Sequence, residues 1–130
     1  MDQALQTHTG QCHCGVVSFR FKAPSVIDIT QCDCSICSMT GYQHVFVTKG
    51  RLDFISGEDN LKVYTFNTGA AQHMFCKTCG IKPLYVPRSH PDSYSVNLRC
   101  VTSQTLSIGK TIQFCGKNWE DNIAGLRDET

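Results

Sequence analysis

Residues 10–21 read GQCHCGVVSFRF and set two closely spaced cysteines, Cys12 and Cys14, beside an alternating run. The run, Gly15–Phe21, is rich in β-branched and aromatic residues with a period of two, which is typical of a strand with one buried face. Two cysteines separated by one residue in an extended segment point to the same side of the chain, so both can bind one ion. The stretch therefore predicts a strand that begins at a metal site.

Two further cysteine clusters follow along the chain. QCDCSIC carries Cys32, Cys34 and Cys37, and FCKTCG carries Cys76 and Cys79. In a reducing compartment such spacings indicate metal ligands or catalytic thiols rather than disulfides. The odd total of 9 cysteines would also leave one unpaired in any scheme made only of disulfides.

The clusters divide into one set of four ligands and one set of three. Zinc takes four thiolates in a closed structural site, whereas three protein ligands leave a corner for water or substrate, as catalytic zinc requires. We therefore expect two zinc ions per chain, one structural and one catalytic. The structural ion is expected on a four-cysteine cluster of Cys12, Cys14, Cys76 and Cys79, and the catalytic ion on a three-cysteine set of Cys32, Cys34 and Cys37.

One alternative keeps both ions structural. Cys100 would then close the second site as a fourth ligand, although an isolated cysteine at a strand-like position is more often a small core residue. A thioredoxin-like redox pair is not favoured, because the βαβ context of that motif is missing. His73, three residues before Cys76, could lie near the open site, but an ordinary core or surface histidine is the simpler interpretation.

The rest of the chain predicts one domain over residues 1–130 that is mainly β. We expect mainly antiparallel β-sheets that cross or form a barrel-like sandwich pinned by zinc, with a short C-terminal helix over Trp119–Leu126 capped by Asn118. A helical turn is compatible with Ser35–Met39. Besides the first run, strands are expected at Gln43–Thr48, Leu52–Ile55, Leu61–Phe66, Leu84–Val86, Tyr94–Leu98 and Thr111–Phe114.

Composition narrows the classes of function. A hydrophobic content of 41% suffices for a core, and a net charge of +1 without a Lys/Arg run gives no reason to expect nucleic acid or an anionic membrane as partner. The longest apolar stretches are too short to cross a bilayer. The N-terminal MDQALQTHTG has neither a basic start nor an apolar core, so no secretory signal is predicted and a cytoplasmic or nuclear location is expected.

The three cysteine motifs, together with TFNTGAAQHMFCKTCGIKPLYVPRS at residues 65–89, resemble the glutathione-dependent formaldehyde-activating enzyme family, most closely its centromere protein V branch. The similarity runs from about Thr9 to Trp119. It implies an Mss4-like β-fold with a structural zinc on the four-cysteine cluster and a catalytic zinc on the three-cysteine set. This division agrees with the one drawn from spacing.

The resemblance also implies a carbon–sulfur lyase that links glutathione, formaldehyde and S-hydroxymethylglutathione. The partner would be glutathione or a glutathione adduct, and Cys32, Cys34 and Cys37 would be the catalytic residues. Basic side chains near the third motif could bind the two glutathione carboxylates, although solvated surface is the simpler interpretation of each: Lys82, Arg88 and Arg99. The competing hypothesis is a non-enzymatic zinc module that binds a protein partner, which Cys100 as a fourth ligand would favour.

Overall fold

The computed structural model describes residues 4–32, 35–66, 69 and 71–114 of the 130-residue chain. These residues form three β-sheets, one short α-helix and three 3-10 turns, and none of the helices among them is both long and apolar enough to cross a bilayer. The elements are β1 (Gln6–Gln11), β2 (Ser18–Ala23), β3 (Val26–Cys32), α1 (Ser35–Thr40), β4 (Gln43–Thr48), η1 (Lys49–Arg51), β5 (Leu52–Ser56), η2 (Glu58–Asn60), β6 (Leu61–Tyr64), β7 (His73–Cys76), β8 (Leu84–Tyr85), β9 (Ser93–Asn97), η3 (Leu98–Cys100) and β10 (Ser107–Phe114).

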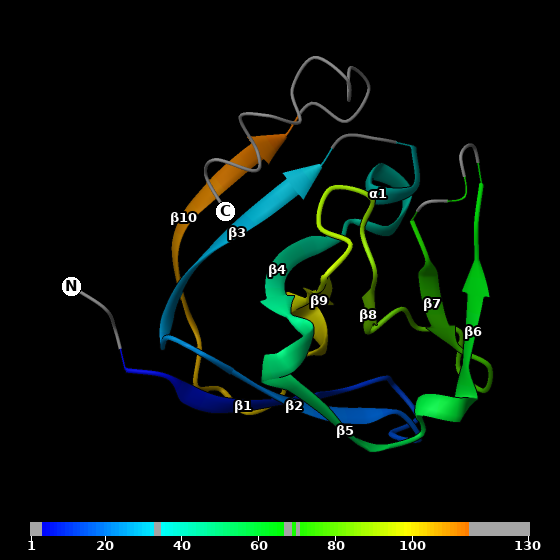
Figure 1. Cartoon of the computed structure of the whole chain (residues 1–130), viewed down its shortest axis with the longest axis horizontal. Helices are drawn as coiled ribbons and strands as arrows, with labels where there is room; N and C mark the ends of the chain where they lie inside the picture. The colour runs from blue at the N-terminus through cyan, green and yellow to red at the C-terminus, as the bar shows by residue number, and fades with distance from the viewer. Residues whose placement is uncertain (1–3, 33–34, 67–68, 70, 115–130) are drawn as a thin grey trace.

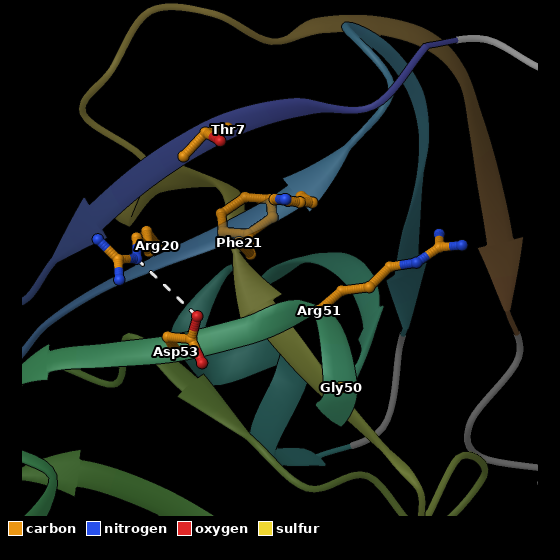
Figure 2. A pocket seen from close by; sticks show the side chains of 7 residues that line it. Thr7, Arg20, Phe21, Gly50, Arg51 and Asp53 are labelled. Carbon is orange, nitrogen blue, oxygen red and sulfur yellow. Dashed lines mark ion pairs between the residues drawn. The ribbon is translucent and has the colours of Figure 1, made fainter.

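The first sheet, in the order β1-β2-β5, is antiparallel and runs below the other strands in Figure 1. Its alternation follows the sequence, since Phe19 and Phe21 are buried while Arg20 and Lys22 are exposed. The outer face holds a depression of about 430 Å³, across which Arg20 Nε lies 3.9 Å from Asp53 Oδ2 (Figure 2). The depression is lined by Thr7, Arg20, Phe21, Lys22, Gly50, Arg51 and Asp53.

The second sheet has the order β10-β3-β4-β9-β8, and one of its pairs is parallel. The expectation of mainly antiparallel sheets is confirmed for the described strands, and the pair of β3 with β10 is a parallel exception. After η3 the chain passes beside β1, where Thr102 N donates to Thr9 O at 2.9 Å. It then reaches the start of β3, where Ser107 N donates to Ser25 O at 2.7 Å, so β10 can only run in the same direction as β3.

All the predicted strands are present, but three of the observed strands were not predicted. Gln43–Thr48 has the predicted bounds, and six other predicted strands overlap β2, β5, β6, β8, β9 and β10. The strands β1, β3 and β7 were not predicted. The helical turn expected at Ser35–Met39 is present as α1, which spans Ser35–Thr40. The helix expected at Trp119–Leu126 lies outside the described residues.

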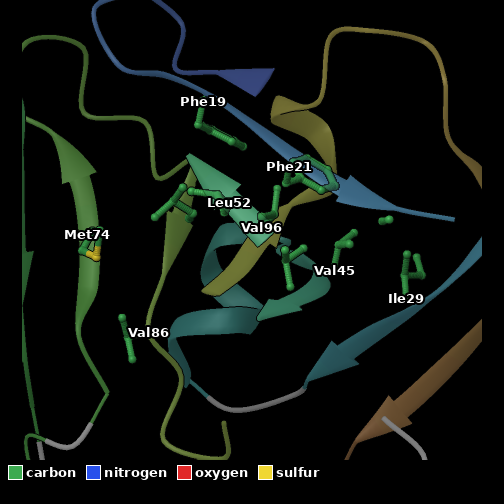
Figure 3. Close-up of a cluster of buried hydrophobic side chains, with 11 residues drawn as sticks. Phe19, Phe21, Ile29, Val45, Leu52, Met74, Val86 and Val96 are labelled. Atoms are coloured by element: carbon green, nitrogen blue, oxygen red, sulfur yellow. The ribbon is translucent and has the colours of Figure 1, made fainter. Parts of the chain in front are cut away.

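The core gathers side chains from all three sheets, including the third, the antiparallel pair β6-β7 (Figures 1 and 3). Phe19 and Phe21 from β2 meet Val45 from β4 and Val96 from β9, and all four are at most 3% exposed. Each such side chain contributes about 1.5–3 kcal/mol through burial. A second small cluster, of Cys12, Val17 and Cys76, packs partly buried hydrophobic residues around two of the predicted ligands.

Candidate metal centre and the Cys37 site

Four predicted ligands meet where β1 and β7 end. Cys12 directly follows β1, and Cys76 is the last residue of β7. Each opens a tight turn: Gly15 N donates to Cys12 O at 3.1 Å, and Gly80 N donates to Cys76 O at 2.8 Å. These turns bring the second cysteine of each pair back toward the first, which is how short cysteine spacings supply adjacent corners of a metal site.

The four sulfurs have the spacing of a zinc tetrahedron. The Sγ atoms of Cys12, Cys14, Cys76 and Cys79 all lie within 4.8 Å of one another. Cys14 Sγ is 3.6 Å from Cys12 Sγ and 3.7 Å from Cys76 Sγ. A tetrahedron with zinc–sulfur bonds of about 2.3 Å has edges of about 3.8 Å. The four-cysteine cluster therefore fits zinc in both donor type and size, and could hold one metal ion.

Hydrogen-bond donors surround these sulfurs. Val17 N lies 3.4 Å from Cys12 Sγ, and Thr78 N and Asn60 Nδ2 each lie 3.4 Å from Cys76 Sγ. Such donors stabilise thiolates and hold ligand side chains in place around an ion. Asn60 belongs to η2, so this turn also anchors the cluster.

The four thiol groups shift one another's pKa values. Burial raises the pKa of Cys76, but the backbone N–H groups of Cys79 and Thr78 and the thiols of Cys12 and Cys14 outweigh it and lower the pKa to about 6. The Val16 N–H lowers the pKa of Cys14, but burial and the three neighbouring thiols outweigh it and raise the pKa to about 11. Like charges this close disfavour one another, and a bound cation would remove the conflict.

The two described members of the three-cysteine set lie elsewhere in the fold. Cys32 is half-buried at the end of β3, and Cys37 is buried on α1. Cys34 lies outside the described residues. Among the described residues, neither Cys32 nor Cys37 joins the four-cysteine cluster, which is complete without them.

Cys100 is a buried thiol on η3. Burial and the Cys12 and Cys79 thiols raise its pKa to about 11. Within the described part of the chain it belongs to no group of candidate ligands, whether with Cys32 and Cys37 or with the four-cysteine cluster. Because Cys34 lies outside the described residues, the alternative in which Cys100 completes a second site stays a hypothesis.

Cys37 packs against a polar cluster that the sequence did not reveal. Its Sγ lies 3.4 Å from His44 Nε2, and His44 Nδ1 lies 2.7 Å from Ser95 Oγ and 3.3 Å from the Tyr85 hydroxyl. The Tyr42 hydroxyl donates to the Ser95 carbonyl at 2.6 Å. All five residues are buried. The signal available in the sequence was only that His44 and Ser95 lie next to apolar residues on predicted strands, which does not distinguish a core residue from a functional one.

Lys82 and His73 extend this cluster on its other side. Lys82 Nζ lies 2.7 Å from His73 Nδ1, 3.8 Å from the centre of the Tyr85 ring and 4.8 Å from that of Tyr42. The His73 ring stacks on Tyr85 at 4.9 Å. The half-buried Lys82 thus places its ammonium group on two tyrosine rings, both of which also contact the His44 ring, at 4.6 Å for Tyr42 and 5.7 Å for Tyr85. Of the three basic candidates, Lys82 is the one these contacts join to the surroundings of Cys37.

The surface depression on the first sheet contains none of the predicted site residues. It lies at the opposite end of β1 from Cys12, because Thr7 pairs with Lys22 and Gln11 pairs with Ser18. Its basic side chains line an exposed sheet face and are separate from the cysteines.

Comparison with known proteins shows the family to which the chain belongs. A model of the glutathione-dependent formaldehyde-activating enzyme family matches residues 7–117, which is most of the chain. The chain belongs to this family. The predicted family is thereby confirmed, and the centromere protein V branch stays a prediction.

Two individual proteins are similar to this family member. A curated protein of Halomonas elongata, named "Putative glutathione-dependent formaldehyde-activating enzyme", is 31% identical over 78 residues, which are 54% of this chain and 50% of the relative. The matched region thus spans half the length of that relative. A crystal structure of a Rhodobacter sphaeroides protein is 33% identical and superposes with a TM-score of 0.65 over 79% of this chain and 98% of its own. The mainly β architecture is therefore shared with a solved structure.

Proposed function

We propose that the protein is a zinc-dependent carbon–sulfur lyase that forms or cleaves S-hydroxymethylglutathione. The family match supports glutathione and formaldehyde as the chemistry involved. The observation that carries the proposal is that the four-cysteine cluster is complete without Cys32 and Cys37. Two cysteines of a CxCxxC motif are thereby left for another role, and one of them lies beside a buried histidine.

The four-cysteine cluster would hold a structural zinc. Its spacing fits the ion, and its two halves come from segments far apart in the chain. A structural zinc of this kind contributes apparent binding free energies of about 10–16 kcal/mol, which is comparable with the whole stability of a domain. Folding of this protein would therefore depend on the ion.

The three-cysteine set would hold a second zinc. Cys32, Cys34 and Cys37 would be its ligands, and the ion would supply a soft Lewis acid that lowers the pKa of a substrate thiol. In the synthetic direction the glutathione sulfur attacks the formaldehyde carbon, a carbon–sulfur bond forms, the carbonyl π-bond breaks, and the thiol proton ends on the new hydroxyl group. In the reverse direction the same bond breaks and the proton returns to sulfur. Cys37 would hold its sulfur against His44, away from the four-cysteine cluster.

Glutathione brings two carboxylates that need partners. Lys82 is suited to bind one of them, because its ammonium group is half-buried on the Tyr42 and Tyr85 rings near the Cys37 site. A charged hydrogen bond at a partly buried site is stronger than one at an exposed surface. The rings would also exclude water from one side of the bound tripeptide.

Exchange spectroscopy by NMR tests the reaction directly. Protein, glutathione and formaldehyde are mixed, and the exchange rate between free formaldehyde and S-hydroxymethylglutathione is measured against the uncatalysed rate. We expect acceleration by the wild-type protein and the background rate for Cys37→Ser, with the structural zinc retained in both. A wild-type protein that carries two zinc ions and gives no acceleration would refute the lyase proposal.

A further inference from the structure

His44 lies between Cys37 and two hydroxyl groups. It is 2% exposed on β4, with Nε2 at 3.4 Å from the Cys37 sulfur. Its other nitrogen, Nδ1, faces Ser95 Oγ at 2.7 Å and the Tyr85 hydroxyl at 3.3 Å. The two ring nitrogens therefore face different groups: Nδ1 faces two hydroxyls, and Nε2 faces a thiol or thiolate.

This difference favours one tautomer. The hydroxyls of Ser95 and Tyr85 can rotate to donate a proton to Nδ1, whereas a thiolate at Cys37 can only accept one. Nδ1 is then the acceptor, and Nε2 carries the hydrogen and donates it to the Cys37 sulfur. A doubly protonated ring would keep the same donor at Nε2, so the direction of this hydrogen bond does not depend on the charge of His44.

The fold holds the ring in this orientation. His44 and Ser95 lie on the adjacent antiparallel strands β4 and β9, where His44 pairs with Asn97, so Ser95 is a diagonal neighbour on the same face. The Tyr42 hydroxyl donates to the Ser95 carbonyl at 2.6 Å, and burial raises the pKa of Tyr42 well above its ordinary value, so this donor keeps its proton. The His44 ring is also packed between Tyr42, at 4.6 Å, and Phe46, at 6.0 Å.

We propose that His44 is a positioning residue that donates Nε2–H to the Cys37 sulfur and fixes its direction. The role of Cys37 as a ligand rests on the proposed function, whereas the direction of the hydrogen bond rests on the geometry together with a thiolate at Cys37. A hydrogen bond to a ligand thiolate withdraws electron density from the sulfur. It thereby partly restores the Lewis acidity that three thiolates would otherwise take from the ion. Ser95 and Tyr85 act through His44 by keeping Nδ1 an acceptor.

The tautomer can be measured without any metal at the second site. Long-range ¹H–¹⁵N correlation spectra of ¹⁵N-histidine protein, recorded at about pH 10, above the ordinary pKa of both histidine (about 6.5) and cysteine (about 8.5), report which nitrogen of His44 is protonated when Cys37 is a thiolate. We expect hydrogen at Nε2 and not at Nδ1. The opposite tautomer would overturn the proposal whether or not the protein is a lyase.

Cobalt substitution tests the effect on the ligand. The four-cysteine cluster is filled first with one equivalent of Zn²⁺, and the second site is then titrated with Co²⁺ while the sulfur-to-cobalt charge-transfer band is recorded. His44→Phe removes the donor and keeps a ring, so we expect the band to move to lower energy and the zinc affinity of the second site to fall about 10- to 100-fold. His44→Gln keeps an N–H near the position of Nε2 and should restore the wild-type band.

Two further variants separate this role from a merely structural one. Ser95→Ala removes a hydroxyl from Nδ1 and should shift the band in the same direction as His44→Phe, but by less. Ser93→Ala, two residues away on the same face of β9, should leave the band unchanged. A wild-type band in a folded His44→Phe variant, or in Ser95→Ala if His44→Phe does not fold, would overturn the proposal. If the wild-type protein takes up no second metal, the proposed function fails, and the tautomer spectrum still decides the hydrogen bond.

Discussion

The sulfurs of Cys14 and Cys76 lie 3.7 Å apart although 62 positions separate the two residues in the chain. This contact joins the turn after β1 to the end of β7, two segments that belong to different sheets. Because an ion at this point would link two segments that are far apart in the chain, the four-cysteine cluster should respond to mutation differently from the other cysteines.

Cys76→Ser should largely unfold the protein at 25 °C. The substitution removes a buried ligand, and losing most of about 10–16 kcal/mol of metal binding exceeds the stability of about 5–15 kcal/mol typical of a domain. Circular dichroism melts and native mass spectrometry measure the fold and the zinc content. Cys100→Ala is the control, because Cys100 is also buried but lies outside the four-cysteine cluster; the substitution should cost about 1 kcal/mol and retain all zinc. Equal loss of zinc in both variants would contradict the assignment of ligands.

Cys37→Ser should leave a folded protein with one zinc instead of two. The predicted second site lies outside the four-cysteine cluster, so its loss removes an ion without removing the structural one. Native mass spectrometry counts the ions, and a cooperative thermal melt shows that the fold is retained. If Cys37→Ser unfolds as completely as Cys76→Ser, the division into structural and catalytic sites is wrong.

Gly57→Ala should destabilise the protein more than Gly41→Ala. Both glycines have left-handed backbone conformations, with φ of 77° and 66°, so alanine costs about 1–2 kcal/mol at either position. Only at Gly57 would the new Cβ meet backbone, at 2.1 Å from Val16 O, whereas at Gly41 nothing lies within 4 Å. Overpacking against the Cys12–Val17 turn should add about 1–3 kcal/mol. Urea unfolding measures both variants, and equal losses would show that the contact relaxes freely.

Glutathione binding at neutral pH should release a proton. A thiol with a pKa near 8.5 is mostly protonated at pH 7 and would lose its proton on becoming a zinc-bound thiolate. Calorimetry in two buffers of different ionisation enthalpy measures the number of protons released. Binding should vanish in Cys37→Ser and be weak for S-methylglutathione, whose sulfur cannot become a thiolate. The absence of binding to zinc-loaded wild-type protein at millimolar glutathione would remove the main support for the lyase.

Lys82→Gln should raise KM for glutathione about 10-fold with little change in kcat. The substitution removes a charged donor that would hold a substrate carboxylate equally in the ground and transition states, and such a contact contributes about 1.5–3 kcal/mol. The matched control is Lys62→Gln, on exposed β6, which should leave both constants unchanged. A fall in kcat with unchanged KM would indicate that Lys82 acts in the chemical step and does not anchor the substrate.

By itself, the sequence determined the β character, the bounds of β4 and the family. Alternation and cysteine spacing are local, and a period of two or a CxxC turn carries its meaning within a few residues. The strands β1, β3 and β7 were missed for the same reason. His73–Cys76 is short, and Val26–Cys32 mixes buried and exposed residues without a clear period, so neither carries a strong local signal.

Only the tertiary structure decided the parallel pairing of β3 with β10, the 3.6 and 3.7 Å sulfur contacts, and the place of His44 beside Cys37. Each depends on where the chain returns after a long connection, and that is set by packing of the whole core. A lone histidine on a strand has the same local pattern whether it is buried among apolar residues or held by Ser95 and Tyr85 against a sulfur. Its chemistry arises from neighbours that come from β8, β9 and α1, which no spacing along the sequence encodes.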